Sequence, residues 1–378
     1  MLIAGVSTRA LAASAARAGY HVTAIDAFGD TDLRTVAEVI SFRQTAGVRF
    51  SPTAAAAAAR SVEADLVAYT SNLENYPQAV AGLARGRHLL GNPPAVLRAV
   101  RNPFELMRSL RRDGFAVPAT RASAPPSAHA ARHWLVKPRR SGGGHGTAPW
   151  RRGRPVSRSA YLQERIPGVP GSIVFASDGR RAVTLGLSRQ LVGLPPLGAH
   201  GFRYCGSLLA SARQPVFERQ VELLARATAL AEAVTAAFGL RGLNGLDFIA
   251  RDGLPFPIEV NPRYSASMEL VERATGCSLF AIHATACGGR LPEPVDLPVR
   301  VHGKAIVFAR QDVVVRDPGT WAALTLADVP HADERIGQAH PICTVLADDA
   351  DAERCLRALV AGATTIYRAV EPRTQGAA

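Results

Sequence analysis

LNGLDFIARDGLPFPIEVNPR, residues 243–263, is the stretch of sequence that decides the fold of the second half of the chain. Asp252-Gly253 between two apolar runs is a strong signal for the turn of a β-hairpin. If the loop is the three residues Asp252–Leu254, then Asp247 and Glu259 lie at equal distances from its centre. Such residues are cross-strand partners on one face, about 5 Å apart. The sequence therefore predicts a hairpin that holds two carboxylates side by side.

The predicted pair has the chemistry of a metal site. Two carboxylates this close repel each other unless a cation lies between them, and Asn261, two residues beyond Glu259, adds an amide oxygen on the same face. Oxygen ligands without His or Cys favour Mg²⁺ or Mn²⁺ shared with substrate phosphates. The alternative is a surface hairpin with outward acids, but Leu246 and Phe248 imply that the other face is buried. A strict two-residue turn would shift the register by one and separate the carboxylates.

Two further segments precede the hairpin. HWLVKPRRSGGGHG, residues 133–146, places Lys137 at the end of an apolar strand, followed by a glycine-rich loop. Backbone N–H groups of such a loop can approach phosphate oxygens closely. It is not a P-loop, because the lysine comes before the glycines, and a flexible hairpin tip is an equal alternative. YLQERI, residues 161–166, predicts only a strand that runs into a turn at Pro167-Gly168.

The N-terminal part of the chain alternates strands and helices. Met1–Val6 predicts a strand, Arg9–Ala18 a helix closed by Gly19, and His21–Asp26 a second strand. This order is typical of a parallel α/β sheet, and strands at Asp65–Thr70 and His88–Gly91 continue it. Beyond residue 133 short strands joined by glycine turns predict an α+β region. A long helix is expected over Pro215–Phe238, shorter helices over residues 266–275 and 279–287, and a last one over Ala352–Leu359.

Length and composition limit the classes of protein that fit. A chain of 378 residues is expected to form two or more domains. No apolar run approaches the ~20 residues that span a bilayer, and Arg9 and Arg17 interrupt the first helix, so we expect neither a membrane segment nor a secretory signal but a cytoplasmic protein. The scattered cysteines, 205, 277, 287, 343 and 355, disfavour disulfides and thiolate zinc. The net charge of +13 is spread along the chain, which argues against specific nucleic-acid binding.

Lysine is rare in this chain. Lys137 and Lys304 are the only lysines, and arginine supplies the other 42 of the 44 basic residues. Where a composition so favours arginine, a lysine is a candidate for chemistry that needs a compact point charge. Lys304, in GKAIVFA, is therefore a catalytic candidate; the alternative is a residue that merely ends a strand.

Taken together and in order, these segments resemble the ATP-grasp superfamily. The motifs that carry the resemblance are VKP (136–138), SGGGHG (141–146), LQERIPG (162–168), GLDF (245–248) and IEVNPR (258–263). The resemblance implies an N-terminal parallel α/β domain, residues 1–120, that ends at the linker-like Arg121–Ser127. An ATP-grasp fold of two α+β subdomains, 121–175 and 176–300, holds ATP between them, and residues 301–378 complete the fold.

The resemblance also implies a role for each motif. Lys137 is expected to contact the ATP phosphates, and Asp247, Glu259 and Asn261 to hold one or two Mg²⁺ ions. Arg263 is expected to steady the transferring phosphoryl group, so that every role is electrostatic or positional. The remaining expected ATP contacts come from the glycine loop and the strand after it: Ser141, Gly142, Gly143, Gly144, His145, Gly146, Gln163, Glu164, Arg165 and Ile166.

Within the superfamily the chain resembles predicted ligases related to biotin carboxylase, including members associated with methanopterin-type one-carbon cofactor biosynthesis. The stretches that carry this narrower likeness are residues 7–32, 186–193, 204–207 and 327–345. One departure concerns a nucleotide-binding lysine that many grasp enzymes carry just after the first domain. Here that neighbourhood reads RNPFELMRSL, with Arg101 and no lysine, which leaves the adenine-side contacts open.

The function that the resemblance implies is an ATP-dependent ligase that joins a small carboxylate to an amine, or to a thiol, through an acyl-phosphate. A carboxylase or phosphotransferase on the same nucleotide site is one alternative, and a non-catalytic ATP sensor is another. A complete acidic triad argues against the sensor, because sensing needs no metal geometry suited to turnover. Homodimers are common among such enzymes.

Overall fold

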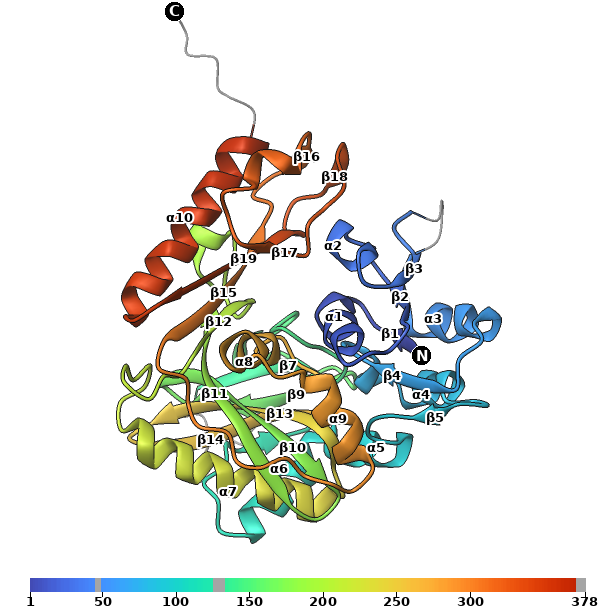
Figure 1. The fold of residues 1–378 in the computed structure, drawn as a ribbon. Coiled ribbons are helices and arrows are strands. Elements are labelled where there is room, and N and C mark those ends of the chain that lie inside the picture. Colours follow the sequence, from blue (N-terminus) through green and yellow to red (C-terminus); the bar gives the residue numbers. More distant parts are fainter. Residues whose placement is uncertain (45–48, 125–132, 372–378) are drawn as a thin grey trace, which may run out of the picture.

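The computed structural model describes residues 1–44, 49–124 and 133–371. Residues 1–89 form the predicted parallel sheet, with strands in the order β3-β2-β1-β4-β5 (Figure 1). The strands are β1 (Leu2–Ala4), β2 (Thr23–Asp26), β3 (Glu38–Ser41), β4 (Leu66–Tyr69) and β5 (His88–Leu89). The helices are α1 (Arg9–Arg17), α2 (Thr31–Arg34), α3 (Pro52–Ala58) and α4 (Pro77–Leu83), with 3₁₀ turns at Ala59–Ser61 and Leu73–Asn75.

The first strand, helix and turn lie where the sequence predicts them. Gly19 has a positive φ of 86°, as expected of the residue that ends a helix. Thr8 is the residue before α1, but its hydroxyl does not cap the helix. Thr8 instead donates from both its N–H and its hydroxyl to Asp26 Oδ2, over 2.6 and 2.7 Å. Asp26 thereby ties the end of β2 to the start of α1.

The remainder of the described chain is antiparallel sheet with helices, the predicted α+β class. A four-stranded sheet has the order β6-β9-β7-β8 and an eight-stranded sheet the order β14-β13-β10-β11-β12-β15-β19-β17. The first contains β6 (Thr120–Arg121), β7 (Trp134–Pro138), β8 (Ala148–Pro149) and β9 (Ala160–Glu164). The second contains β10 (Val169–Asp178), β11 (Ala182–Val192), β12 (Tyr204–Leu209), β13 (Arg241–Arg251), β14 (Leu254–Asn261), β15 (Val301–Phe308), β17 (Leu326–Ala327) and β19 (Pro341–Asp349).

Helices cover both faces of the eight-stranded sheet. Side chains such as Ile173, Phe175 and Phe248 pack with α7 on one face, and Val174 and Leu243 pack with α8 and α9 on the other. The remaining elements are α5 (Pro94–Val100), α6 (Pro103–Arg112), α7 (Gln220–Phe238), α8 (Met268–Thr275), α9 (Leu279–Cys287), β16 (Val313–Val315), β18 (Glu334–Ile336) and α10 (Ala352–Val370), with 3₁₀ turns at Pro195–Leu197 and Pro318–Trp321. None of the described helices is long and apolar enough to cross a membrane.

Two predicted helix boundaries are wrong. Helix α7 begins at Gln220, five residues after the predicted start, because the Gln220 side chain accepts the backbone N–H of Val216 and holds the preceding segment in a turn. Helix α10 continues to Val370 rather than stopping near Leu359, since its second half carries a further apolar face that includes Ile366. The predicted linker Arg121–Ser127 begins in β6, and its part beyond residue 124 lies outside the described residues.

Candidate nucleotide and metal site

The β13–β14 hairpin brings the predicted carboxylates together, but with a turn that differs from the prediction and with an added β-bulge. Its turn is the two residues Asp252-Gly253, both with positive φ, rather than the three-residue loop predicted. A β-bulge at Ile258 puts one extra residue into β14, and this restores the register, so that Asp247 pairs with Glu259. The predicted pairing is thus confirmed and the predicted loop is wrong.

Asn261 completes the group of oxygen-bearing side chains. It pairs with Gly245, two residues before Asp247, and its amide donates to Asp247 Oδ2 over 2.9 Å. Burial and the charge of Glu259 raise the pKa of Asp247 to about 6. Although burial acts against ionisation of Glu259 too, Arg101, Lys137 and Arg263 lower its pKa. Glu259 is therefore the ionised carboxylate of the pair, and its charge disfavours ionisation of Asp247.

Arg101 is a member of the site that the sequence analysis noted only as a departure. Its guanidinium donates to Glu259 Oε2 over 3.3 Å and to the carbonyl of Val260 over 2.9 Å. It also donates to Asn75 Oδ1 and to the carbonyl of Ser141. One arginine thus joins the acidic hairpin, the N-terminal domain and the start of the glycine loop. The one sequence signal for it was the arginine at the place where a nucleotide-binding lysine was expected.

Arg263 lies in a buried ion pair rather than in open solvent. Its NH2 group is 2.8 Å from Glu74 Oε1 and 3.3 Å from Asn261 Oδ1. Glu74, from the 3₁₀ turn after β4, is 1% exposed. Four buried polar atoms on this pair and on residues two positions away have no hydrogen-bond partner among the described residues: Asn72 Oδ1, Glu74 Oε2, Arg263 Nε and Ser265 Oγ. Unpaired buried polar atoms are expected where a polar ligand binds.

Lys137 reaches the same site from the four-stranded sheet. Its ammonium donates to Gln163 Oε1 over 3.1 Å, and Gln163 in turn donates to the carbonyl of the bulge residue Ile258 over 3.3 Å. Glu164 faces elsewhere, because its carboxylate accepts the N–H of Ala119. Next to these strand residues, the Arg165 side chain is exposed and Ile166 is half-buried.

The glycine loop follows Lys137 and rests on the segment before β12. Gly143, Gly144 and Gly146 have positive φ, whereas Gly142 does not. The Gly143 carbonyl accepts the N–H of Tyr204 over 3.0 Å, and Ser141 Oγ donates to the carbonyl of His145 over 2.6 Å. Burial, Arg203 and His340 lower the pKa of His145, so its ring stays neutral at physiological pH.

We expect Gly144→Ala to displace the glycine loop from the segment before β12. A Cβ at Gly144, where φ is +77°, would lie 1.8 Å from the Phe202 carbonyl oxygen. A left-handed alanine also costs roughly 1–2 kcal/mol. Hydrogen exchange at the loop amides should therefore quicken about tenfold. Gly142→Ala is the matched control, because its Cβ would meet nothing within 4 Å. Equal exchange in the two variants would contradict the contact.

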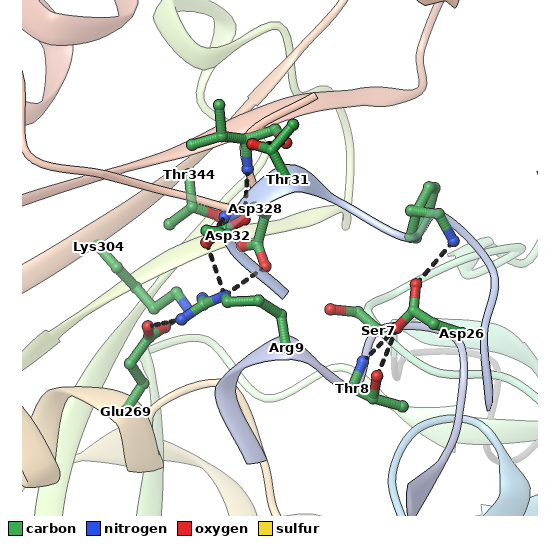
Figure 2. Close-up of polar contacts among 12 residues, drawn as sticks. Ser7, Thr8, Arg9, Asp26, Thr31, Asp32, Glu269, Lys304, Asp328 and Thr344 are labelled. Carbon is green, nitrogen blue, oxygen red and sulfur yellow. Dashed lines mark hydrogen bonds and ion pairs between the residues drawn. The ribbon is translucent and has the colours of Figure 1, made fainter. Parts of the chain in front are cut away.

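Lys304 lies apart from the metal pair. On β15 it is 4% exposed, and its ammonium donates to Glu269 Oε2 over 2.6 Å (Figure 2). Glu269, on α8, also binds Arg9 of α1. Arg9 continues the network to Asp328 over 3.0 Å and to Asp32 over 3.4 Å. The structure thus brings Lys137, Gln163, Arg263 and the acidic residues together and places Lys304 in a separate charged cluster.

Part of the chain matches a known domain family. Residues 100–267 match the model of the ATP-grasp domain. An uncharacterized protein of Methanocaldococcus jannaschii is 26% identical over 120 residues, which are 31% of this chain and 28% of that protein. The chain thus aligns with little more than a quarter of that relative.

Solved structures extend the likeness to almost the whole chain. The L-amino acid ligase of Bacillus licheniformis has a TM-score of 0.69 at 15% identity, over 98% of this chain and 97% of that one. The biotin carboxylase domain of Hydrogenobacter thermophilus 2-oxoglutarate carboxylase, a dimer in complex with magnesium-ADP and bicarbonate, has a TM-score of 0.68 at 12% identity, over 94% and 88%. The match to the ATP-grasp domain model thus covers residues 100–267, and the chain as a whole has the fold of biotin carboxylase and L-amino acid ligase.

Proposed function

We propose that this protein is an ATP-dependent ligase that joins a carboxylate to an amine. The observation that carries the proposal is the ring of charge around Glu259: Asp247 faces it across the hairpin, and Arg101, Lys137 and Arg263 lower its pKa. Alternating acidic and basic groups of this kind suit magnesium and the phosphates of a nucleotide. The matching ATP-grasp domain supports the same chemistry.

The residues present fit magnesium and ATP. Asp247, Glu259 and Asn261 offer oxygen atoms only, which is the donor set of Mg²⁺ and Mn²⁺. The described residues contain no group of three or more His, Cys, Asp or Glu side chains that could hold a metal alone. An ion here would therefore take its remaining ligands from phosphate oxygens and water. When bound, it would neutralise phosphate charge. Asp247 and Glu259 face each other across the hairpin, and a cation between them would relieve their repulsion.

Each remaining predicted residue has a place in this proposal. Lys137 holds the phosphates, Arg263 faces the transferring group, and the loop of residues 141–146 covers them. Residues 163–166 line the adenine and ribose side, partly through backbone groups, while the Gln163 side chain contacts Lys137 and Ile258. Arg101 supplies the cation that the sequence lacks at the expected lysine position.

In the proposed reaction a carboxylate oxygen of the substrate attacks the γ-phosphorus of ATP. The bond to the β–γ bridging oxygen breaks, and ADP and an acyl-phosphate form. The amine then attacks the acyl carbon, loses a proton, and displaces phosphate. The protein's own contribution is to hold the groups close and to exclude water. The likeness to predicted ligases of methanopterin-type cofactor biosynthesis adds one-carbon cofactor assembly as the proposed pathway.

Calorimetric titration of ATP with and without Mg²⁺ tests this proposal. Wild type should bind ATP more tightly with Mg²⁺, and Lys137→Ala should weaken binding roughly 10- to 100-fold, since a hydrogen bond to a charged group contributes about 1.5–3 kcal/mol. Arg180→Ala removes an exposed cation from the β10–β11 turn and should change nothing. Failure of folded wild type to bind ATP would contradict the proposal. ADP release that requires bicarbonate would indicate a carboxylase instead.

A further inference from the structure

A row of polar side chains crosses one face of the eight-stranded sheet. Directly paired residues of antiparallel strands share a face, as do residues two apart in one strand. The pairing joins Asp247 to Ser172 and Ser172 to Ser188, and then, two residues along β11, Gln190 to Ser207 and Ser207 to Lys304. The row thus runs from the metal pair on β13 across three strands to Lys304 on β15.

This row interrupts a face that is otherwise apolar. Val174, Leu209 and Leu243 flank it and pack with α8 and α9. Polar groups buried on such a face cost stability unless they are hydrogen-bonded. Ser188 donates to the Ser172 carbonyl over 3.4 Å, and Ser207 is hydrogen-bonded to Tyr204. Asp247 and Gln190 are half-buried, whereas Ser172, Ser188, Ser207 and Lys304 are buried, so solvent reaches the row at Asp247 and at Gln190.

The hydroxyl of Tyr204 contacts the row next to Lys304. It is 2.9 Å from Ser207 Oγ. Besides burial, the charges of both Asp247 and Glu269 raise the pKa of Tyr204. Tyr204 therefore lies beside Ser207, the cross-strand partner of Lys304.

The distance along the row decides what Lys304 can bind. Asp247 and Lys304 stand four strands apart, which at ~4.8 Å per strand is roughly 19 Å between their Cα atoms. The two side chains close only part of that gap. A carboxylate bound between the metal pair and ATP is therefore out of reach of Lys304, and any anion on Lys304 must be a second one.

The ion pairs of Lys304 make such binding feasible. Glu269 has two cationic partners, with Lys304 on Oε2 and Arg9 on Oε1 (Figure 2). Removing the only partner of a buried charge is costly. Because Arg9 stays on Glu269, Lys304 can turn toward an incoming anion without leaving Glu269 unpaired.

We propose that Lys304 binds a second, distal carboxylate of the substrates, carried by an amino acid that supplies the amine or by a dicarboxylic acid. The inference rests on the proposed ligase function, and it names the substrate class of that site. The reacting group of the substrate lies at the metal pair, and the row of hydroxyl and amide groups lies along the substrate. Lys304 binds the carboxylate at the substrate's far end.

The two-lysine composition provides a direct test. In protein labelled with ¹⁵N-lysine, saturated with Mg-ADP, the side-chain ammonium groups give two signals, which Lys304→Met assigns. Acetate should shift the Lys304 signal, and chloride at equal ionic strength should not. In Arg9→Met the acetate shift should disappear, because Lys304 is then the only cation on Glu269. A Lys304 signal that acetate leaves unmoved overturns the proposal.

Turnover measurements identify the source of the carboxylate. ADP release is compared with L-amino acids, with their amides, and with dicarboxylic acids. Lys304→Met should raise the KM of the carboxylate-bearing substrate 10- to 100-fold, leave the KM of ATP unchanged, and be partly rescued by Lys304→Arg. Arg300→Gln, which removes an exposed ion pair with Asp348 at the start of β15, is the control. Equal KM values in Lys304→Met and wild type overturn the proposal, whereas loss of Mg-ADP binding by wild type is a failure of the ligase function itself.

Discussion

Asp247→Asn should reduce magnesium-dependent ADP formation by on the order of a thousandfold, and Glu259→Gln should do the same. The pair provides the two carboxylates that face each other across the hairpin, and a metal ion supplies several kcal/mol of charge stabilisation in phosphoryl transfer. ADP release at saturating ATP measures the effect. Glu353→Gln, which removes an exposed carboxylate from α10, is the control and should be fully active.

Asp247→Asn should also make the metal-free protein more stable. Asp247 has a pKa of about 6 in the folded protein, above its ordinary value of 3.8. It therefore binds its proton more tightly in the folded state, and its contribution to stability is lost as the pH rises from about 4 to about 6. Asp247→Asn removes that loss. Mg²⁺ should raise the melting temperature of wild type but not of the variant. A variant that is fully active, or equally stabilised by Mg²⁺, would falsify the metal assignment.

Arg263→Met should have the second largest effect. Loss of one donor aimed at developing charge typically lowers kcat by about 10²–10³. The substitution also leaves Glu74, which is 1% exposed, without its cationic partner. Removal of one partner from a buried ion pair lowers the free energy of unfolding by about 3–5 kcal/mol. We therefore expect slow ADP formation together with a lower free energy of unfolding, measured by urea denaturation.

A double variant separates the two consequences of losing Arg263. Arg263→Met with Glu74→Met removes both charges of the pair, so most of the lost unfolding free energy should return. ADP formation should stay slow, because the arginine is still absent. If activity recovers together with stability, Arg263 has only a structural role and the assignment to phosphoryl transfer is wrong.

The hairpin shows how much of the site could be predicted from sequence. Asp252-Gly253 identifies the turn, and the apolar alternation identifies the strands. The pairing of Asp247 with Glu259 was predicted with a three-residue loop, whereas in the structure it depends on a two-residue turn and the bulge at Ile258. The bulge at Ile258 has no such signal, because it depends on contacts from another sheet. Gln163 donates to the Ile258 carbonyl from β9, almost a hundred residues earlier.

Residues that enter the site from the N-terminal domain were harder to predict. Glu74 follows β4 in sequence, and nothing near it marks a partner 189 residues away. Arg101 stood out only because a lysine was expected there. Its contacts with Val260 and Ser141 come from packing of α5 and α6 beside the eight-stranded sheet. Long-range burial of charge leaves no local periodicity, so the structure was needed to find both residues.

The Ile258 bulge has a consequence for how this hairpin can change during evolution. A two-residue turn with one extra residue in β14 and a three-residue turn without it place the same two carboxylates opposite each other. An insertion at Asp252-Gly253 is therefore neutral for the site only when Ile258 is deleted, and each change alone separates the pair. Relatives should show compensating length changes at these two points, so an alignment that scores them as independent gaps would misplace one of the carboxylates.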